Sequence, residues 1–209
     1  MKPQHTDGHV IHWAWLYDSV LRVTTLGQEQ SLRRQTIELA ELRPGQRILD
    51  IGCGTGTLLI LAAQAVPGIR AQGIDPSPEM IERARQKAVE AGVETSFEVG
   101  AIEKLDFETE TVDVVMCSLM LHHLPTRTLH DGLVEILRVL KPGGRLVVID
   151  FPGPGPMLHR LSAVLSRGRP PTRHVVEVLE QLHTLGFTSV VRGRPKPGFL
   201  FSVVARKPD

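Results

Sequence analysis

Residues 48–57 read Ile-Leu-Asp-Ile-Gly-Cys-Gly-Thr-Gly-Thr, a buried-strand pattern that ends in three closely spaced glycines. A helical pattern follows at once over Thr57–Val66. Glycine permits a tight turn and a close approach of backbone to a ligand, and the amides at a helix start favour an anionic group. Because open α/β sheets bind ligands beyond the carboxyl ends of their strands, this loop predicts a ligand site.

The glycine spacing separates two classes of ligand. A dinucleotide-binding loop has the spacing G-x-G-x-x-G, whereas Gly52, Gly54 and Gly56 give G-x-G-x-G, with the last glycine one residue early. This disfavours a nicotinamide-dependent oxidoreductase, which remains the less favoured enzyme on this architecture. A plain strand–helix turn without a ligand is the third interpretation, but three glycines cost backbone entropy that such a turn does not require.

Around this loop, short apolar runs alternate with helical patterns. Strands are predicted where runs rich in Val and Ile are bounded by Gly, Pro or Asp, at Gln46–Ile51, Ile69–Ile74, Thr95–Val99, Val112–Cys117, Arg145–Asp150, Thr188–Arg192 and Phe199–Ala205. Helices are predicted at Gly27–Leu42, Thr57–Val66, Pro78–Ala91, Thr128–Leu140 and Pro171–Leu185. The alternation predicts an α/β fold with a parallel sheet and helices on both faces. The turn-rich link between the last two strands predicts an antiparallel hairpin.

The chain of 209 residues suits one domain with a small appendage. We predict an N-terminal helical segment or lid at 1–42 and a ligand-binding domain at 43–209, with an excursion at 151–171. An apolar content of 42% and a charged content of 22% are typical of a soluble globular protein. The polar N-terminus has no apolar signal region, and no apolar run reaches the roughly 18 residues of a membrane span. A cytoplasmic location is therefore expected.

Charge and cysteine content restrict the partners. A formal net charge of +1 gives no global field for nucleic acid, and two cysteines are too few for a disulfide framework or a zinc site. Basic residues outnumber acids after Phe151, which is interpreted either as a solvated basic face or as attraction for an anionic substrate or a membrane surface.

Asp75 ends the second predicted strand in the sequence Gly73-Ile74-Asp75. An acid at a strand end, about twenty residues after a glycine loop, can accept both ribose hydroxyls of a nucleoside. Alternatively, Asp75 caps the turn into Ser77 and Pro78, a role that is compatible with the first.

Five segments together resemble the class I S-adenosylmethionine-dependent methyltransferases, most of all the ubiquinone/menaquinone-biosynthesis-type C-methyltransferases and related small-molecule methyltransferases. They are Ile48–Gly56, Gly73–Met80, Phe97–Phe107, Val112–Leu124 and Leu140–Val148. The resemblance implies a Rossmann-like three-layer sandwich, with a mostly parallel seven-stranded sheet and one antiparallel C-terminal strand. It also implies methyl transfer from S-adenosylmethionine to a carbon or oxygen nucleophile of a small molecule, without a metal.

The same resemblance implies a set of cofactor-binding residues. Those around the methionine portion and its sulfonium end are Asp50, Gly52, Cys53, Gly54, Gly56, Cys117 and Ser118. On the adenosine side, Asp75 would hold the ribose, Pro76 and Met80 would lie near the adenine, and Ile102 would offer its backbone N–H. Ala101 stands where the family usually has an acid that accepts from the adenine amino group, and Glu103 is the candidate substitute.

His122 and His123 are the candidate general bases, since histidine takes up a proton near neutrality. The alternative is that one packs against the following helix and the other caps it. Tyr17 is a further candidate, as part of a lid or as a packing partner of Trp13 and Trp15. Cys53 and Cys117 are interpreted as small buried residues rather than as ligands of a soft metalloid.

The acceptor is predicted to be a small molecule rather than DNA, RNA or protein. Segment 117–120 lacks the Asn-Pro-Pro-Tyr-type sequence in which amide- and base-modifying N-methyltransferases resemble each other. The resemblance implies that the acceptor pocket is built from Met1–Thr25 and Phe151–Pro170, and a homodimer is one option for its completion. A non-catalytic module that binds S-adenosylmethionine, or an interaction module, is the alternative function.

Overall fold

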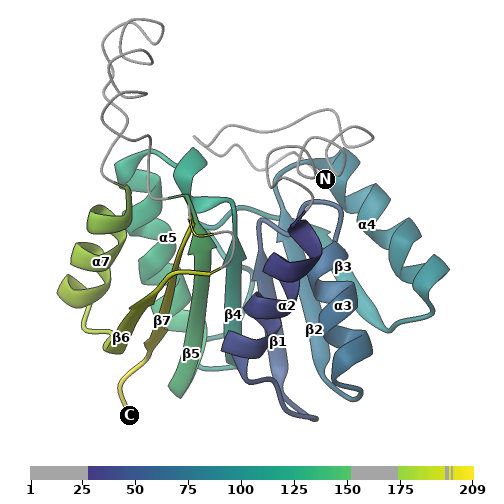
Figure 1. The fold of residues 1–209 in the computed structure, drawn as a ribbon, viewed down its shortest axis with the longest axis horizontal. Coiled ribbons are helices and arrows are strands. Elements are labelled where there is room, and N and C mark those ends of the chain that lie inside the picture. The colour runs from purple at the N-terminus through teal and green to yellow at the C-terminus, as the bar shows by residue number, and fades with distance from the viewer. Residues whose placement is uncertain (1–27, 152–173, 196–197, 199) are drawn as a thin grey trace, which may run out of the picture.

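The computed structural model describes residues 28–151, 174–195, 198 and 200–209. Its strands form one sheet in the spatial order β3-β2-β1-β4-β5-β7-β6 (Figure 1). The strands are β1 (Arg47–Ile51), β2 (Arg70–Asp75), β3 (Thr95–Val99), β4 (Val112–Ser118), β5 (Leu140–Asp150), β6 (Thr188–Gly193) and β7 (Phe201–Arg206). β7 pairs antiparallel with β5 and β6, and the other neighbouring pairs are parallel. The predicted fold class and the predicted hairpin are confirmed.

Helices cover both faces of this sheet. They are α2 (Glu29–Ala40), α3 (Thr57–Ala65), α4 (Pro78–Ala91), α5 (Thr126–Val139), α7 (His174–Thr184) and the short 3₁₀ helix η1 (Leu121–His123). Successive side chains of a strand point to opposite faces. Accordingly, Ile48 packs in the hydrophobic cluster with α2, α3 and α4, while its neighbour Leu49 packs in the cluster with α5 and α7. The sheet is therefore the middle of three layers.

α4 shows how local sequence sets the boundaries of an element. Ser77 caps its start by accepting a hydrogen bond from the N–H of Met80 (3.3 Å), and Pro78 occupies the first helical position. Gly92 ends the helix in the left-handed conformation, which costs glycine little. The predicted limits of this helix are confirmed residue for residue.

The junction of α5 and β5 differs from the prediction. α5 begins two residues before the predicted Thr128, and β5 begins at Leu140 rather than Arg145. Leu140 pairs with Val112, and the register shifts before Arg145 pairs with Val114. Lys207 exchanges backbone hydrogen bonds with the intervening glycine pair, Gly143 and Gly144. This long-range pairing extends a strand through a Pro-Gly-Gly sequence that by itself indicates a turn.

α2 brings the N-terminal part of the described chain to the ligand edge of the sheet. It begins near the edge where the parallel strands end, runs down against the sheet and leads into β1 (Figure 1). Its buried residues Leu32, Thr36 and Ala40 face the core. The first turn of α2 therefore lies beside the glycine loop. Most of the predicted lid and excursion, with Trp13, Trp15 and Tyr17, lies outside the described residues, so these boundaries remain predictions.

Candidate functional site: a pocket at the glycine loop

The glycine loop turns sharply between β1 and α3. Gly52, Gly54 and Gly56 all have positive φ, at 68°, 52° and 75°, where a side chain would be strained. Gly52 and Cys53 both donate their N–H groups to the carbonyl of Ile74, at 2.9 and 3.0 Å. These bonds fasten the loop to the end of β2, so several loop amides are already committed within the protein.

Close packing requires two of these glycines to lack a side chain. A Cβ added at Gly52 would lie 2.8 Å from Cβ of Met120, and one added at Gly56 would lie 2.7 Å from the ring of Phe97. The loop thus packs on one side against Phe97 of β3 and on the other against Met120, which follows β4. The glycine pattern reflects packing as well as access for a ligand.

Asp75 ties the second strand to the loop. Its Oδ2 accepts from the N–H of Gly54 (3.0 Å), and its Oδ1 accepts from the N–H of Ser77 (2.9 Å). Burial raises the pKa of this carboxyl above its ordinary value, and the two backbone donors oppose that shift. The capping role is therefore present. A carboxylate has about four acceptor sites, so capacity for ligand hydroxyls remains.

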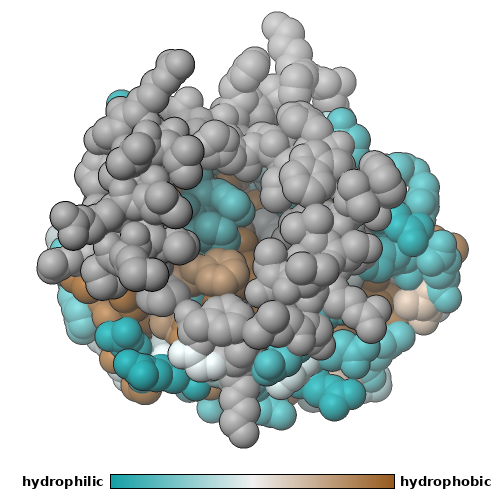
Figure 2. All heavy atoms as spheres, turned by 45° about the horizontal axis from the view of Figure 1, so that its top comes forward, coloured by the Kyte–Doolittle hydropathy of each residue, from teal (hydrophilic) through white to brown (hydrophobic). Residues whose placement is uncertain are grey.

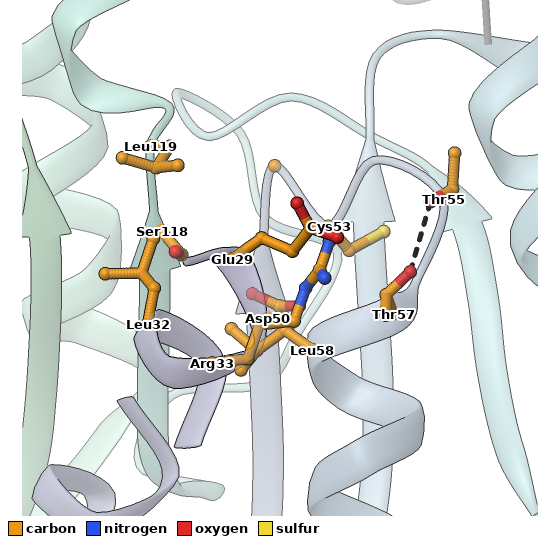
Figure 3. Close-up of a pocket in the computed structure, with 11 residues that line it drawn as sticks. Glu29, Leu32, Arg33, Asp50, Cys53, Thr55, Thr57, Leu58, Ser118 and Leu119 are labelled. Atoms are coloured by element: carbon orange, nitrogen blue, oxygen red, sulfur yellow. Dashed lines mark hydrogen bonds between the residues drawn. The ribbon is translucent and has the colours of Figure 1, made fainter. Parts of the chain in front are cut away.

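A pocket opens between the start of α2, the glycine loop and the end of β4 (Figure 3). Its lining includes Asp50, Gly52, Cys53 and Ser118, all predicted from the sequence. The remaining lining residues were not predicted: Glu29, Leu32, Arg33, Thr55, Thr57, Leu58 and Leu119. In Figure 3, Glu29 and Arg33 extend from α2 toward the loop.

Two carboxylates in this pocket have unsatisfied oxygens. Oε2 of Glu29 and Oδ2 of Asp50 are buried without a hydrogen-bond partner in the described part of the chain. Burial, followed by the charge of Asp75, raises the pKa of Asp50 to about 8, and the nearby charge of Arg33 opposes the shift. Unpaired buried carboxyl oxygens are costly. The pocket therefore presents unused acceptors, accompanied by one guanidinium.

Residues predicted on the adenine side lie beyond the second strand rather than in this pocket. Met80, Ala101 and Ile102 are almost fully buried, and Ile102 packs in the cluster with α5. Oε2 of Glu103 is buried and has no hydrogen-bond partner among the described residues. This leaves Glu103 with an acceptor to offer, whereas the side chains of Met80 and Ile102 are part of the core.

The two cysteines face different layers of the fold. β1 and β4 are neighbours, and Ile51 pairs with Cys117. Cys53 packs with the α3 and α4 cluster, whereas Cys117 packs with the α5 cluster. Burial is the first cause that raises the pKa of both thiols well above their ordinary value. Both are therefore protonated, and only Cys53 lines the pocket.

His122 follows β4 and lies against the end of β5. Its Nδ1 is 2.5 Å from Oδ1 of Asp150, and its backbone N–H donates to Oδ2 of the same carboxylate at 3.0 Å. The ring of His123 is 3.9 Å from that of His122, centroid to centroid. Asp150 did not emerge from the sequence as a site residue, because 28 positions separate it from His122.

The missed residues of α2 carried a weak signal. Glu29 and Arg33 are four residues apart and thus share a helix face, close to the buried stripe that contains Leu32. A charged pair beside an apolar stripe is also typical of an ordinary surface helix. Only the placement of α2 against the glycine loop distinguishes the two cases.

Figure 2 tilts the molecule so that the ligand edge of the sheet comes forward, and hydrophobic and hydrophilic surfaces of described residues meet near the centre of this view. None of the helices described is long and apolar enough to cross a membrane. In the same residues, no group of three or more His, Cys, Asp and Glu side chains is placed to hold a metal ion.

The sequence of this chain is similar to a known family and to several known proteins. Residues 48–144 match the family described as "Methyltransferase domain". The chain is 36% identical over 138 residues to a demethylmenaquinone methyltransferase of Deinococcus radiodurans, which covers 66% of this chain and 56% of the relative. It is 33% identical over 141 residues to the ubiquinone/menaquinone biosynthesis C-methyltransferase UbiE of Geotalea daltonii, covering 66% and 59%. The chain thus spans less than two thirds of these relatives.

The fold is also similar to a solved structure. Phosphoethanolamine N-methyltransferase 2 of Haemonchus contortus, in complex with S-adenosyl-L-methionine, superimposes with a TM-score of 0.71 at 20% identity. The superposition covers 88% of this chain and 53% of that chain.

Proposed function

This chain belongs, through residues 48–144, to the methyltransferase domain family and is related to the UbiE-type class I enzymes, and we propose that it transfers a methyl group from S-adenosylmethionine to a carbon or oxygen nucleophile of a small molecule. S-Adenosylmethionine already carries a good leaving group. The protein therefore contributes chiefly proximity and alignment, and it requires no preformed catalytic triad.

The hydrogen bond between Gly54 and Asp75 carries the proposal. At 3.0 Å it joins the glycine loop of one strand to the acid that ends the neighbouring strand. A nucleoside with a charged tail needs both features side by side. It needs an acceptor for its ribose hydroxyls and a loop without bulky side chains, so that its tail can approach the backbone. The spacing of these glycines also supports S-adenosylmethionine over a nicotinamide dinucleotide.

The pocket fits the methionine end of this cofactor. That end carries an ammonium and a carboxylate, and the pocket offers unsatisfied oxygens of Glu29 and Asp50 together with Arg33. We propose that the two acids hold the ammonium and that Arg33 holds the carboxylate. Charge-assisted hydrogen bonds of this kind are about twice as strong as neutral ones. Gly52, Gly54, Gly56 and Cys53 then line the tail, with Ser118 and the backbone of Cys117 beside the sulfonium.

The adenosine end is proposed to lie toward β2 and β3. Asp75 is assigned to the ribose hydroxyls, and Pro76 borders the adenine. Because the side chains of Met80 and Ile102 are buried, Ile102 is assigned through its backbone N–H and Met80 through packing beneath the ring. Glu103 is assigned to the adenine amino group, since Ala101 cannot accept a side-chain hydrogen bond.

The cofactor assignment is tested by calorimetry. S-Adenosylmethionine, S-adenosylhomocysteine and NADH are titrated into the wild-type chain and into Asp75→Asn and Asp106→Asn variants. Asp106 is an exposed acid and serves as the control. We expect binding of both S-adenosyl compounds at micromolar concentrations, no binding of NADH, and a loss of about tenfold or more in Asp75→Asn. Absence of binding by the wild type, or unchanged affinity in Asp75→Asn, contradicts the proposal.

A further inference from the structure

Asp150 holds both the ring and the backbone of His122. It ends β5, is fully buried, and accepts from Nδ1 of His122 (2.5 Å), from the backbone N–H of His122 (3.0 Å) and from the N–H of Phe151 (2.7 Å). A buried carboxylate with several donors is firmly positioned. The two contacts to one residue fix the orientation of the imidazole as well as the course of the backbone that carries it.

This contact is the basis on which we assign the tautomer of His122. Oδ1 of Asp150 also accepts from the N–H of Phe151, so we place the proton of the contact on Nδ1, facing a carboxylate that accepts, and Nε2 of a neutral ring then keeps a lone pair. The His122 side chain is 24% exposed, and Nε2 has no partner among the described residues. An oriented imidazole with an available Nε2 and a carboxylate behind Nδ1 is the arrangement of a general base.

The segment that carries His122 also borders the proposed cofactor site. Ser118 and Leu119 line the pocket, and Met120 packs directly against Gly52 of the loop. Leu119 has φ 56°, a strained value for a residue with a side chain, and its N–H is held by the carbonyl of Ile149 at 2.8 Å. The chain is thus forced to turn from the pocket into η1, where His122 is presented.

We propose that His122 is the general base of this site and that Asp150 is its positioning residue, so that the proton which the acceptor loses as the methyl group arrives passes to His122. This inference rests on the proposed function and adds the roles of two residues to it. A neutral amine attacks through its own lone pair, and a thiol is partly ionised near neutrality. A hydroxyl acceptor gains most from a base.

The electrons and protons of the methyl-transfer step balance without a further reactant. The acceptor's electron pair, from oxygen or from the conjugated carbon, forms the new bond to the methyl carbon. The bond from that carbon to the sulfonium sulfur breaks, and its electron pair stays on sulfur. The hydroxyl proton passes to Nε2 of His122, the carboxylate of Asp150 stabilises the imidazolium, and the proton is later released to solvent. With attack through carbon, the hydrogen on that carbon then leaves to solvent as a proton and the oxygen takes a proton back, which restores the hydroxyl and the conjugation, so that one proton is released in all.

The tautomer is measured first, without an acceptor. Long-range proton–nitrogen NMR of the full chain, labelled with ¹⁵N-histidine and saturated with S-adenosylhomocysteine, reports which ring nitrogen of His122 is protonated. His122→Gln assigns the signal. We expect a proton on Nδ1 of the neutral ring in the wild type, and loss of this preference in Asp150→Asn. A proton on Nε2, or an unchanged tautomer in Asp150→Asn, overturns the positioning role.

Transfer is measured next, with methyl-labelled S-adenosylmethionine and the probes catechol and 1,4-dihydroxynaphthalene. We expect His122→Gln to lower kcat/KM about a hundredfold or more with cofactor affinity preserved, and Asp150→Asn to lower kcat. His130→Gln, at an exposed position of α5, is the matched control and should retain activity. Loss in His123→Gln without loss in His122→Gln overturns the assignment, as does transfer to neither probe by a wild-type chain that binds the cofactor. Failure to bind the cofactor at all instead contradicts the proposed function.

Discussion

Replacing Asp50 by Asn is predicted to change how the stability of the chain depends on pH. Asp50 is 1% exposed, and its Oδ2 has no partner in the described structure. Burial and the charge of Asp75 raise its pKa from 3.8 to about 8. Between these two pH values the unfolded chain releases the proton while the folded chain retains it. The folded state therefore loses about 1.4 kcal/mol of stability per pH unit as the pH rises.

From pH 5 to pH 8 this loss sums to about 4 kcal/mol. The amide of the Asp50→Asn variant cannot ionise, so the free energy of unfolding of this variant, minus that of the wild type, should increase by about this amount over the same range. The pH slope is the informative quantity, because any cost of a buried amide is constant with pH. Urea unfolding followed by circular dichroism at several pH values provides the measurement, with the exposed Asp106→Asn as control.

Parallel stability curves for the wild type and Asp50→Asn would refute this account of Asp50. The same substitution removes a proposed partner of the cofactor ammonium, and a hydrogen bond to a charged group contributes about 1.5–3 kcal/mol. Cofactor affinity should thus fall by roughly 10- to 100-fold. A variant that is more stable at pH 8 and binds less tightly would show that the buried acid is retained for ligand binding rather than for folding.

Further predictions concern the loop and the pocket. Gly56→Ala should lower the free energy of unfolding by about 2–5 kcal/mol, because a positive φ and the ring of Phe97 2.7 Å from the new Cβ both oppose a side chain. Gly92→Ala, with a similar φ but open space, should lose only about 1–2 kcal/mol, and equal losses in urea unfolding would contradict the packing argument. Arg33→Gln should weaken S-adenosylmethionine binding about tenfold in calorimetry and leave adenosine binding unchanged; equal weakening of both ligands would exclude a contact to the carboxylate. Binding at pH 7 should release a proton from Asp50, seen as a binding enthalpy that depends on the ionisation enthalpy of the buffer, and the Asp50→Asn variant should show no such dependence.

Local patterns in the sequence were sufficient for most of the secondary structure. The three glycines can adopt positive φ at little cost, which favours the tight turn that they form, and the capping pattern from Ser77 to Gly92 sets the limits of α4. Alternating strands and helices then lead to a parallel sheet with few alternatives. The loop and Asp75 were predicted to serve one ligand, and the structure shows that they meet because they end adjacent parallel strands.

Contacts between segments that are distant in the chain could not be predicted from local sequence patterns. The extension of β5 to Leu140 depends on pairing with Val112 and on bonds from Lys207, which override a Pro-Gly-Gly turn signal. The register of a strand with its partner is a property of the assembled sheet, and no periodicity within one segment encodes it.

The sequence by itself determined the fold class, the glycine loop and the acid of the second strand, because these follow from backbone conformation and spacing over a few residues. Tertiary structure alone decided that Glu29 and Arg33 enter the pocket and that Asp150 holds His122. Both outcomes depend on how helices and strand ends far apart in the chain are packed together. These side chains form a site only because that packing sets the distances between them, their burial and the charges around them.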